Sequence, residues 1–297
     1  MRKELVTHLD PKSPVSETFR TLRTNIQFMN SNRRLRSLLV TSTMPGEGKS
    51  WVASNLAVTF AQAGKRVALI DADMRKGRLY SIFGVEPRPG LSNYLSGYYE
   101  NQESVNIDKY LKQTDVNNLY IIPAGNIPPN PSELLTSQKM IDLIKYLEQI
   151  FDIVIFDGTP STIVTDAIIL SKFVDSTLIV SAHKETKIDD LNQVKRNITN
   201  VGGRIAGVVV NKMPVNKKVN KAGYYYENSI VTSKRTWGIN TKQTPKKKIE
   251  DAEINAVKRK LNEVEKTNEQ SDEKKQEEVD INAVLQQLSQ YLESDKK

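Results

Sequence analysis

The sequence predicts an α/β fold, in which a doubly wound, mostly parallel β-sheet is flanked by helices. Short apolar runs alternate with helical patterns through residues 34–213, and this alternation is typical of parallel strands joined by helical crossovers. The runs are apolar almost throughout, as expected for strands that are buried on both faces of a sheet. A chain of 297 residues has room for one such domain with extensions.

Individual elements can be predicted in order. The strands should lie at 36–41, 66–70, 119–123, 153–156, 176–180 and 205–210. Between them, helical spacing or composition predicts helices at 49–63, 137–149, 163–170 and 188–201. Ahead of the sheet, residues 14–29 should form a helix, because Ser13 can cap its first turn and Pro14 suits the first helical position.

The chain divides into four predicted segments. These are an N-terminal segment with the first helix (1–33), the core (34–213), a flexible segment with three adjacent tyrosines (214–233) and a charged tail (234–297). The last two form a mobile C-terminal extension. The tail contains an imperfect repeat, at 250–257 and 277–284, with apolar residues on one helical face in each copy. Isolated helices this short are marginal in water, so the tail should be disordered, or helical on binding.

Composition excludes several kinds of site. The chain has no cysteine and only two histidines, His8 and His183, so disulfides, thiolate zinc sites and histidine metal sites are excluded, and any metal must be held by oxygen. No run approaches the roughly 18 apolar residues that span a bilayer, and the start of the chain does not resemble a signal peptide, so we expect a cytoplasmic protein. The formal charge of +8 favours an anionic partner such as nucleotide, lipid headgroups or nucleic acid, or only a solvated basic surface.

A phosphate-binding loop is predicted between the first strand and the helix that follows it. Its glycines would let backbone N–H groups approach phosphates, Lys49 would neutralise the β and γ oxygens, and the Ser50 hydroxyl would bind Mg²⁺. A strict pattern has glycine where Thr43 stands, but strand, loop and helix follow in the expected order. The sequence therefore predicts ATP and Mg²⁺ as ligands. The nucleotide-binding residues expected here are Gly46, Glu47, Gly48, Lys49, Ser50 and Trp51.

Three carboxylates follow strands of the predicted sheet. Asp71 and Asp73 come after the second strand, and Asp157 comes after a later one. The carboxyl edge of an open parallel sheet is where ligands bind, and hard oxygen ligands there can position hydrated Mg²⁺. A single aspartate at a strand end is usually a turn former or a helix cap, but three beside a phosphate loop predict a catalytic site.

These motifs resemble those of bacterial tyrosine kinases of the capsule and exopolysaccharide type, a branch of the deviant P-loop ATPases. The resemblance covers residues 14 to about 226 and rests on the pair Asp71 and Asp73 and on the stretches 17–25, 45–50, 90–95, 128–135 and 207–212. It implies an ATP-dependent protein-tyrosine autokinase that regulates capsular or exopolysaccharide synthesis and export.

The resemblance also implies residue roles. Lys49 and Ser50 would hold phosphates and Mg²⁺, Asp71 would accept the tyrosyl proton, Asp73 and Asp157 would arrange the water shell of the metal, and Asn211 would read adenine. A tyrosine hydroxyl has a reference pKa of about 10, so it needs a nearby base or a loose transition state that delays proton loss. The expected phosphoacceptors are Tyr224, Tyr225 and Tyr226.

Partners follow from the same resemblance. It implies a ring-like homo-oligomer in which Glu17, Arg20 and Arg23 contact a neighbouring subunit, although their spacing of three also suits a surface ion network within one helix. It further implies a membrane-embedded activator of the chain-length-regulator type, a cognate tyrosine phosphatase and no nucleic acid. The protein would be cytoplasmic and peripheral to the inner face of the cell membrane.

Two departures from the family pattern keep rival functions open. The family usually has Asp-Thr-Pro-Pro at 157–160, where this chain has Asp-Gly-Thr-Pro, and a proline and a histidine within 75–80, which this chain lacks. One rival is a partitioning or division-site ATPase, but Met44 stands where those relatives carry a signature lysine. The other rival is an ATP-sensing regulator without transfer activity, which an altered Asp157 loop would suit.

Overall fold

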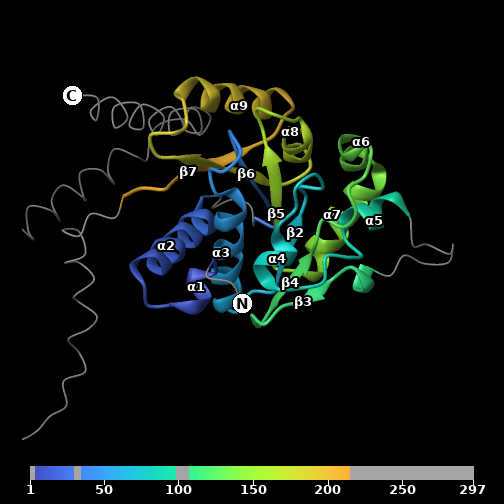
Figure 1. The fold of residues 1–297 in the computed structure, drawn as a ribbon, viewed down its shortest axis with the longest axis horizontal. Coiled ribbons are helices and arrows are strands. Elements are labelled where there is room, and N and C mark those ends of the chain that lie inside the picture. Colours follow the sequence, from blue (N-terminus) through green and yellow to red (C-terminus); the bar gives the residue numbers. More distant parts are fainter. Residues whose placement is uncertain (1–3, 30–34, 98–106, 215–297) are drawn as a thin grey trace, which may run out of the picture. The chain divides into compact units, whose positions relative to one another are not determined.

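The computed structural model describes residues 4–29, 35–97 and 107–214. Within these residues one sheet of seven strands has the order β3-β4-β2-β5-β1-β6-β7 (Figure 1). Every neighbouring pair is parallel except β3 and β4. The strands are β1 (Ser37–Ser42), β2 (Val67–Asp71), β3 (Lys112–Gln113), β4 (Leu119–Ile122), β5 (Ile153–Pro160), β6 (Ser176–Ala182) and β7 (Ile205–Asn211). The doubly wound α/β prediction is confirmed.

Helices precede the sheet and connect its strands. They are α1 (Val6–Leu9), α2 (Pro14–Phe28), α3 (Lys49–Gln62), α4 (Leu79–Phe83), α5 (Leu91–Ser96), the 3₁₀ turn η1 (Ile107–Lys109), α6 (Pro131–Thr136), α7 (Gln138–Ile150), α8 (Asp166–Ser171) and α9 (Ile188–Asn200). No helix of the described residues is both long and apolar enough to cross a bilayer. The predicted mobile extension lies almost wholly outside the described residues, which end at 214.

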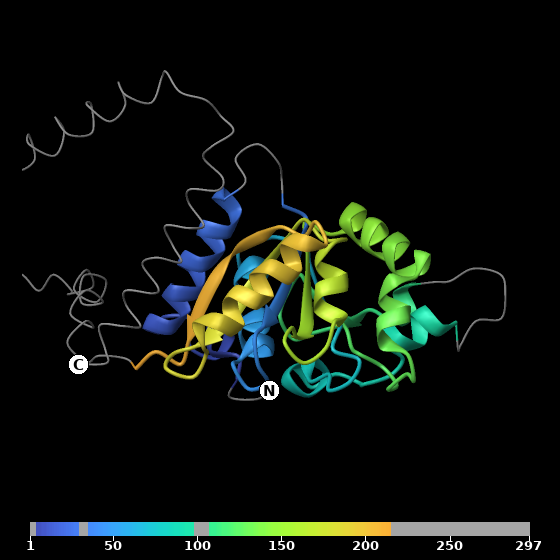
Figure 2. The same cartoon turned by 90° about the horizontal axis from the view of Figure 1, so that it is seen from above.

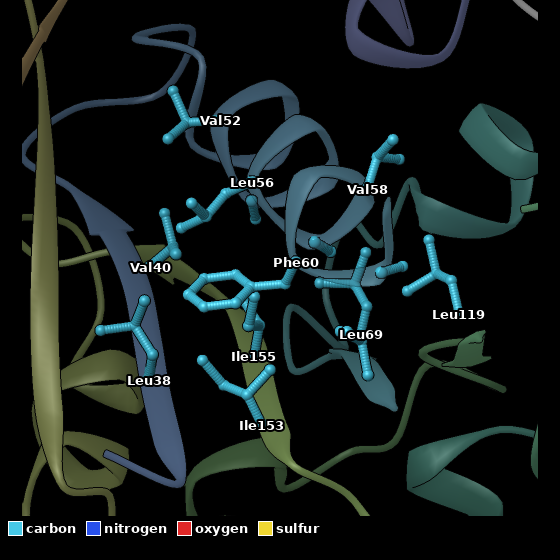
Figure 3. Close-up of a cluster of buried hydrophobic side chains, with 14 of the residues drawn as sticks. Leu38, Val40, Val52, Leu56, Val58, Phe60, Leu69, Leu119, Ile153 and Ile155 are labelled. Carbon is cyan, nitrogen blue, oxygen red and sulfur yellow. The ribbon is translucent and has the colours of Figure 1, made fainter. Parts of the chain in front are cut away.

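Two apolar clusters hold the helices on opposite faces of the sheet. On one face, α1 to α4 pack against alternate strand residues such as Leu38, Leu69 and Ile155, and Leu56 and Phe60 of α3 lie at the centre of this cluster (Figure 3). On the other face, α5 to α8 pack against the intervening residues, among them Leu39. Figure 2 shows the helices on both sides of the strands. Burial on both faces explains why the strands are apolar throughout.

Most predicted elements are confirmed within a few residues. Ser13 caps α2 as expected, because its hydroxyl accepts a hydrogen bond from Ser16 N at 3.2 Å. The helix expected at 163–170 begins only at Asp166. The reason is that the preceding backbone is tied to the loop after β1: the amides of Ser161 and Thr162 donate to the carbonyl oxygens of residues 42 and 43.

Candidate active site

The loop between β1 and α3 has the conformation of a phosphate-binding loop. β1 ends at Ser42 and α3 begins at Lys49, so the loop leads directly into a helix N-terminus. Gly46 and Gly48 have φ angles of +85° and +99°, which residues with a side chain rarely adopt. A side chain at Gly48 would also clash with Nδ2 of Asn211. The backbone therefore requires glycine at both positions.

The ammonium group of Lys49 lies among buried carboxylates. Its Nζ is 3.1 Å from Asp73 Oδ2 and 3.6 Å from Asp157 Oδ1, and it donates to Ser50 Oγ at 3.3 Å. Burial lowers the pKa of Lys49, but the charges of Asp157 and Asp73 outweigh burial and hold this pKa above its ordinary value. The structure thus brings together four residues that the sequence predicted: Lys49, Ser50, Asp73 and Asp157.

Asp71 and Asp157 are neighbours across two strands. They are paired in the register of β2 and β5, and both side chains are fully buried. The expectation that Asp157 lies at the end of its strand, ahead of a loop, is wrong. β5 continues to Pro160, which pairs with Ser42 of β1, so the stretch 157–160 is strand and its geometry is fixed by the sheet.

The surroundings of the carboxyl groups disfavour their ionised form. Burial raises the pKa of Asp71 to about 8, assisted by the charge of Asp157 and opposed by a hydrogen bond from Leu79 N. Burial also raises the pKa of Asp157, and Lys49 opposes that shift. Since one ammonium group faces three carboxyl groups, a further cation at this site would lower the raised pKa values of Asp71 and Asp157 and favour their ionised forms.

The donor set fits Mg²⁺. Both oxygens of Asp157 and Oδ1 of Asp71 are buried and receive no hydrogen bond from the described residues. No three carboxylate or imidazole groups in this part of the chain converge into a cage that could hold a metal ion alone. Mg²⁺ keeps several water ligands and is usually held by one or two protein oxygens together with phosphates. The residues therefore suit a hydrated Mg²⁺ ion beside nucleotide phosphates.

Asp71 is enclosed by the turn that leads into α4. Its Oδ2 accepts a hydrogen bond from Leu79 N at 3.0 Å, so this oxygen holds the start of the helix. A Cβ atom at Gly77 would lie 2.8 Å from the same oxygen, and closer still to Ala124. Glycine at position 77 therefore allows the close approach of this turn to Asp71.

An ion pair that the sequence did not reveal supports the loop after β2. Nε of Arg75 donates to Asp166 Oδ2 at 2.8 Å, and Nη2 of the same guanidinium group donates to Asp166 Oδ1 at 3.1 Å. Ser132 Oγ donates to the same Oδ1 at 2.6 Å. Asp166 is buried, and the pair raises the pKa of Arg75. Through these bonds α6 and α8 fix the loop that carries Asp73.

Three other predicted nucleotide-binding residues make contacts within the protein. The Glu47 side chain is only 3% exposed and bonds to its own loop. The Trp51 ring packs edge-on against Phe19 of α2, with ring centroids 5.1 Å apart. Asn211 Nδ2 donates to the carbonyl oxygen of Glu47 at 2.8 Å, which places this amide at the loop. The role of Asn211 in reading adenine stays a prediction.

The three residues expected at an oligomer interface do not share one environment. Glu17 and Arg20 form an ion pair on α2, and Arg20 also donates to Pro11 O at 2.6 Å. The Arg23 guanidinium instead donates to Thr59 O of α3 at 2.8 Å, so it supports helix packing. The predicted phosphoacceptors, Tyr224, Tyr225 and Tyr226, lie outside the described residues.

The fold and this site define the class of protein. A parallel sheet, a glycine-rich loop between β1 and α3, a lysine in that loop and carboxylates on the adjoining strands are the parts of a P-loop ATPase. The AAA domain family matches residues 36–212. Nucleotide binding follows from this fold.

Comparison with known proteins shows to which family of P-loop ATPases the chain is similar. The chain is 39% identical over 223 residues to the putative tyrosine-protein kinase CapB of Staphylococcus aureus, covering 75% of this chain and 94% of CapB. It is 34% identical over 221 residues to a putative tyrosine-protein kinase in the cps region of Klebsiella pneumoniae, covering 74% of this chain but 30% of that protein. The solved chimerical protein CapA2B2 matches with a TM-score of 0.67 and 37% identity, covering 72% of this chain and 92% of that one.

The chain belongs to the bacterial tyrosine-protein kinases of the P-loop class. The kinase prediction is therefore confirmed at the level of the family. The two rivals, a division-site ATPase and an ATP sensor without transfer activity, are not favoured.

Proposed function

We propose that the chain is an autokinase, which transfers the γ-phosphoryl group of ATP to tyrosines of the same chain or of another copy of it. The reaction would take place at the site built from Lys49 and the buried carboxylates. Through it the protein would regulate capsular or exopolysaccharide synthesis and export. The main support for this site is that the Lys49 ammonium group lies 3.1 Å from Asp73 and 3.6 Å from Asp157, next to the glycine loop. The polysaccharide role draws support from the relative in a cps region.

Each residue has a distinct part in the proposed reaction. Backbone N–H groups of the loop bind the phosphates, and Lys49 neutralises charge on the β and γ oxygens as the transition state forms. Mg²⁺, when bound, neutralises further phosphate charge, and Ser50, Asp73 and Asp157 would hold it and its water shell. A bond forms between the tyrosyl oxygen and the γ-phosphorus, and the bond from that phosphorus to the β–γ bridging oxygen of ATP breaks.

Asp71 is the proposed acceptor of the tyrosyl proton. Its Oδ2 already receives a hydrogen bond from Leu79 N, whereas its Oδ1 is buried and receives none from the described residues. Oδ1 is therefore the atom that would take the proton, once a bound cation lowers the pKa of Asp71 from about 8 and ionises the group. A competing role is purely structural, since Oδ2 also holds the start of α4.

The proposed phosphoacceptors follow the core closely along the chain. Tyr224 comes ten residues after Pro214, a length of chain that can span at most about 36 Å. A tyrosine on so short a tether meets a site at high effective concentration, so it needs little intrinsic affinity. In a ring, a site of the neighbouring subunit would be within reach. Each phosphate adds about −1.5 to −2 charges, and we expect the accumulated repulsion to loosen the ring.

A ring-like oligomer remains a proposal, with Glu17, Arg20 and Arg23 as its contacts, of which Glu17 is exposed and the two arginines are half-buried. A membrane-embedded activator, a tyrosine phosphatase and a position at the inner face of the membrane are proposed on the same family grounds. The role of Asn211 in adenine recognition is proposed on these grounds too.

The proposed ring predicts the oligomeric state of the purified protein. Light scattering at high protein concentration, with and without ATP, should give a mass well above that of one chain. A monomer under both conditions would contradict the ring.

Replacing Lys49 with Met should reduce ATP-dependent tyrosine phosphorylation by on the order of a hundredfold or more, because transition-state charge is left unneutralised. The measurement is incorporation of labelled phosphate from Mg²⁺-ATP into the purified full chain. Lys172→Met, at an exposed position after α8, is the matched control and should retain wild-type activity. Comparable rates for Lys49→Met and wild type would refute the site.

Asp71→Asn should also lower the transfer rate by about a hundredfold or more, since it removes the proposed base while keeping an oxygen that can accept from Leu79 N. Thermal unfolding of this variant should stay close to that of wild type. Asp71→Ala, which removes both functions, should lose activity and stability together. An active Asp71→Asn enzyme would show that the residue only supports α4.

Changing Tyr224, Tyr225 and Tyr226 together to Phe should remove most of the phosphotyrosine that forms on incubation with ATP. Mass spectrometry of wild-type protein should place phosphate on these three residues, because they are tethered near the core. ADP binding by the triple variant should be unchanged, which separates loss of acceptors from loss of the site. Equal labelling of the variant, with phosphate on other tyrosines, would disprove the acceptor assignment.

A further inference from the structure

The carboxylate of Glu47 is buried inside the phosphate loop, where a negative charge opposes phosphate binding unless it is held by donors. Three donors hold it: Thr43 Oγ1 at 2.7 Å, Met44 N at 2.8 Å and Thr186 Oγ1. Thr43 stands where a strict loop pattern has glycine, and here its hydroxyl has a use that glycine could not supply. The binding of phosphates does not by itself account for these contacts.

Among the described residues, Thr186 is the one donor to this carboxylate that comes from outside the phosphate loop. It lies in the turn between β6 and α9, and its amide donates to Ala182 O at 3.0 Å. Its hydroxyl accepts from Ala182 N at 2.8 Å while donating to Glu47 Oε1. A single hydroxyl group therefore joins the end of β6 to the phosphate loop.

The end of β7 completes the arrangement. Asn211 Nδ2 donates to Glu47 O at 2.8 Å, and Asn211 O accepts from His183 N at 2.9 Å. The turn after β6 and the end of β7 are thus bonded to each other, and each is bonded to Glu47. This network fixes both the side chain and the carbonyl group of Glu47.

We propose that Thr186 is a positioning residue for nucleotide binding: with Glu47, it holds the phosphate loop in its binding conformation before nucleotide arrives. The inference rests on the proposed function, which places ATP phosphates at this loop. A loop with glycines at 46 and 48 loses much conformational freedom on ordering, and a loop ordered in advance does not pay that entropy on binding. Charge-assisted hydrogen bonds to a buried carboxylate are strong enough to impose such order.

The test compares Thr186→Val, which removes the hydroxyl at nearly constant shape, with Thr186→Ser, which keeps it. Isothermal titration of the full chain with ADP should give a Kd raised about tenfold for Thr186→Val, equivalent to about 1.4 kcal/mol, and within about twofold of wild type for Thr186→Ser. Thr199→Val is the control, because the exposed Thr199 hydroxyl donates to Lys195 O at 2.9 Å, within α9 itself.

Hydrogen exchange gives a second readout without nucleotide. The Met44 amide, which donates to Glu47 Oε2, should exchange faster in Thr186→Val than in wild type or Thr186→Ser. Unchanged ADP affinity in Thr186→Val would overturn the inference, whether or not the melting temperature falls, because a lower melting temperature alone would indicate a purely structural hydroxyl. If wild-type protein failed to bind ADP, the proposed function itself would be refuted. If wild type and Thr186→Val bound ADP equally well, only the proposed role of Thr186 would be refuted.

Discussion

The pairing of one ammonium group with buried carboxyl groups is the interaction on which this site depends. Lys49 Nζ lies within 3.6 Å of Asp73 and Asp157, and all three side chains are largely withdrawn from water. Buried charges are costly unless they are paired, so the loop that carries Lys49 must sit beside the strands that carry the carboxylates. The pairing also leaves carboxyl groups whose raised pKa values a bound cation would lower, which suits a site that takes up Mg²⁺ together with nucleotide.

The sheet produces this pairing through its strand order. β5 lies between β2 and β1, so Asp71 and Asp157 become neighbours, and Lys49 at the end of the loop after β1 lies 3.6 Å from Asp157. Hydrogen bonds outside the sheet then fix the loops that follow the strands. Arg75 and Asp166 hold the loop after β2, and Glu47 with its donors holds the loop after β1. Chemistry at the sheet edge thus depends on hydrogen bonds from α6, α8 and the turn after β6.

Local pattern was sufficient to predict the strands, the long helices and the central residues of the site. Apolar runs mark strands buried on both faces, and a glycine loop between strand and helix marks phosphate binding. Short helices such as α4 and α5 were missed, since their few residues are stabilised by burial and not by helical pattern. The contact between Thr186 and Glu47 joins residues 139 positions apart, and that of Arg75 with Asp166 joins residues 91 apart. No sequence spacing encodes such pairs, and the same holds for the continuation of β5 past Asp157.

A crystal structure of the full chain with ADP and Mg²⁺ would show whether the pairing of Lys49 with the buried carboxyl groups forms a nucleotide site. We expect nucleotide phosphates in the loop 43–48, Lys49 Nζ in contact with phosphate oxygen, and Mg²⁺ at the Ser50 hydroxyl with its water shell directed to Asp73 and Asp157. The carboxylates should keep their present positions, because the sheet and the loop contacts fix them. Nucleotide bound elsewhere, with the pair of Lys49 and Asp73 still intact, would show that the buried ion pairs are structural and do not form the nucleotide site.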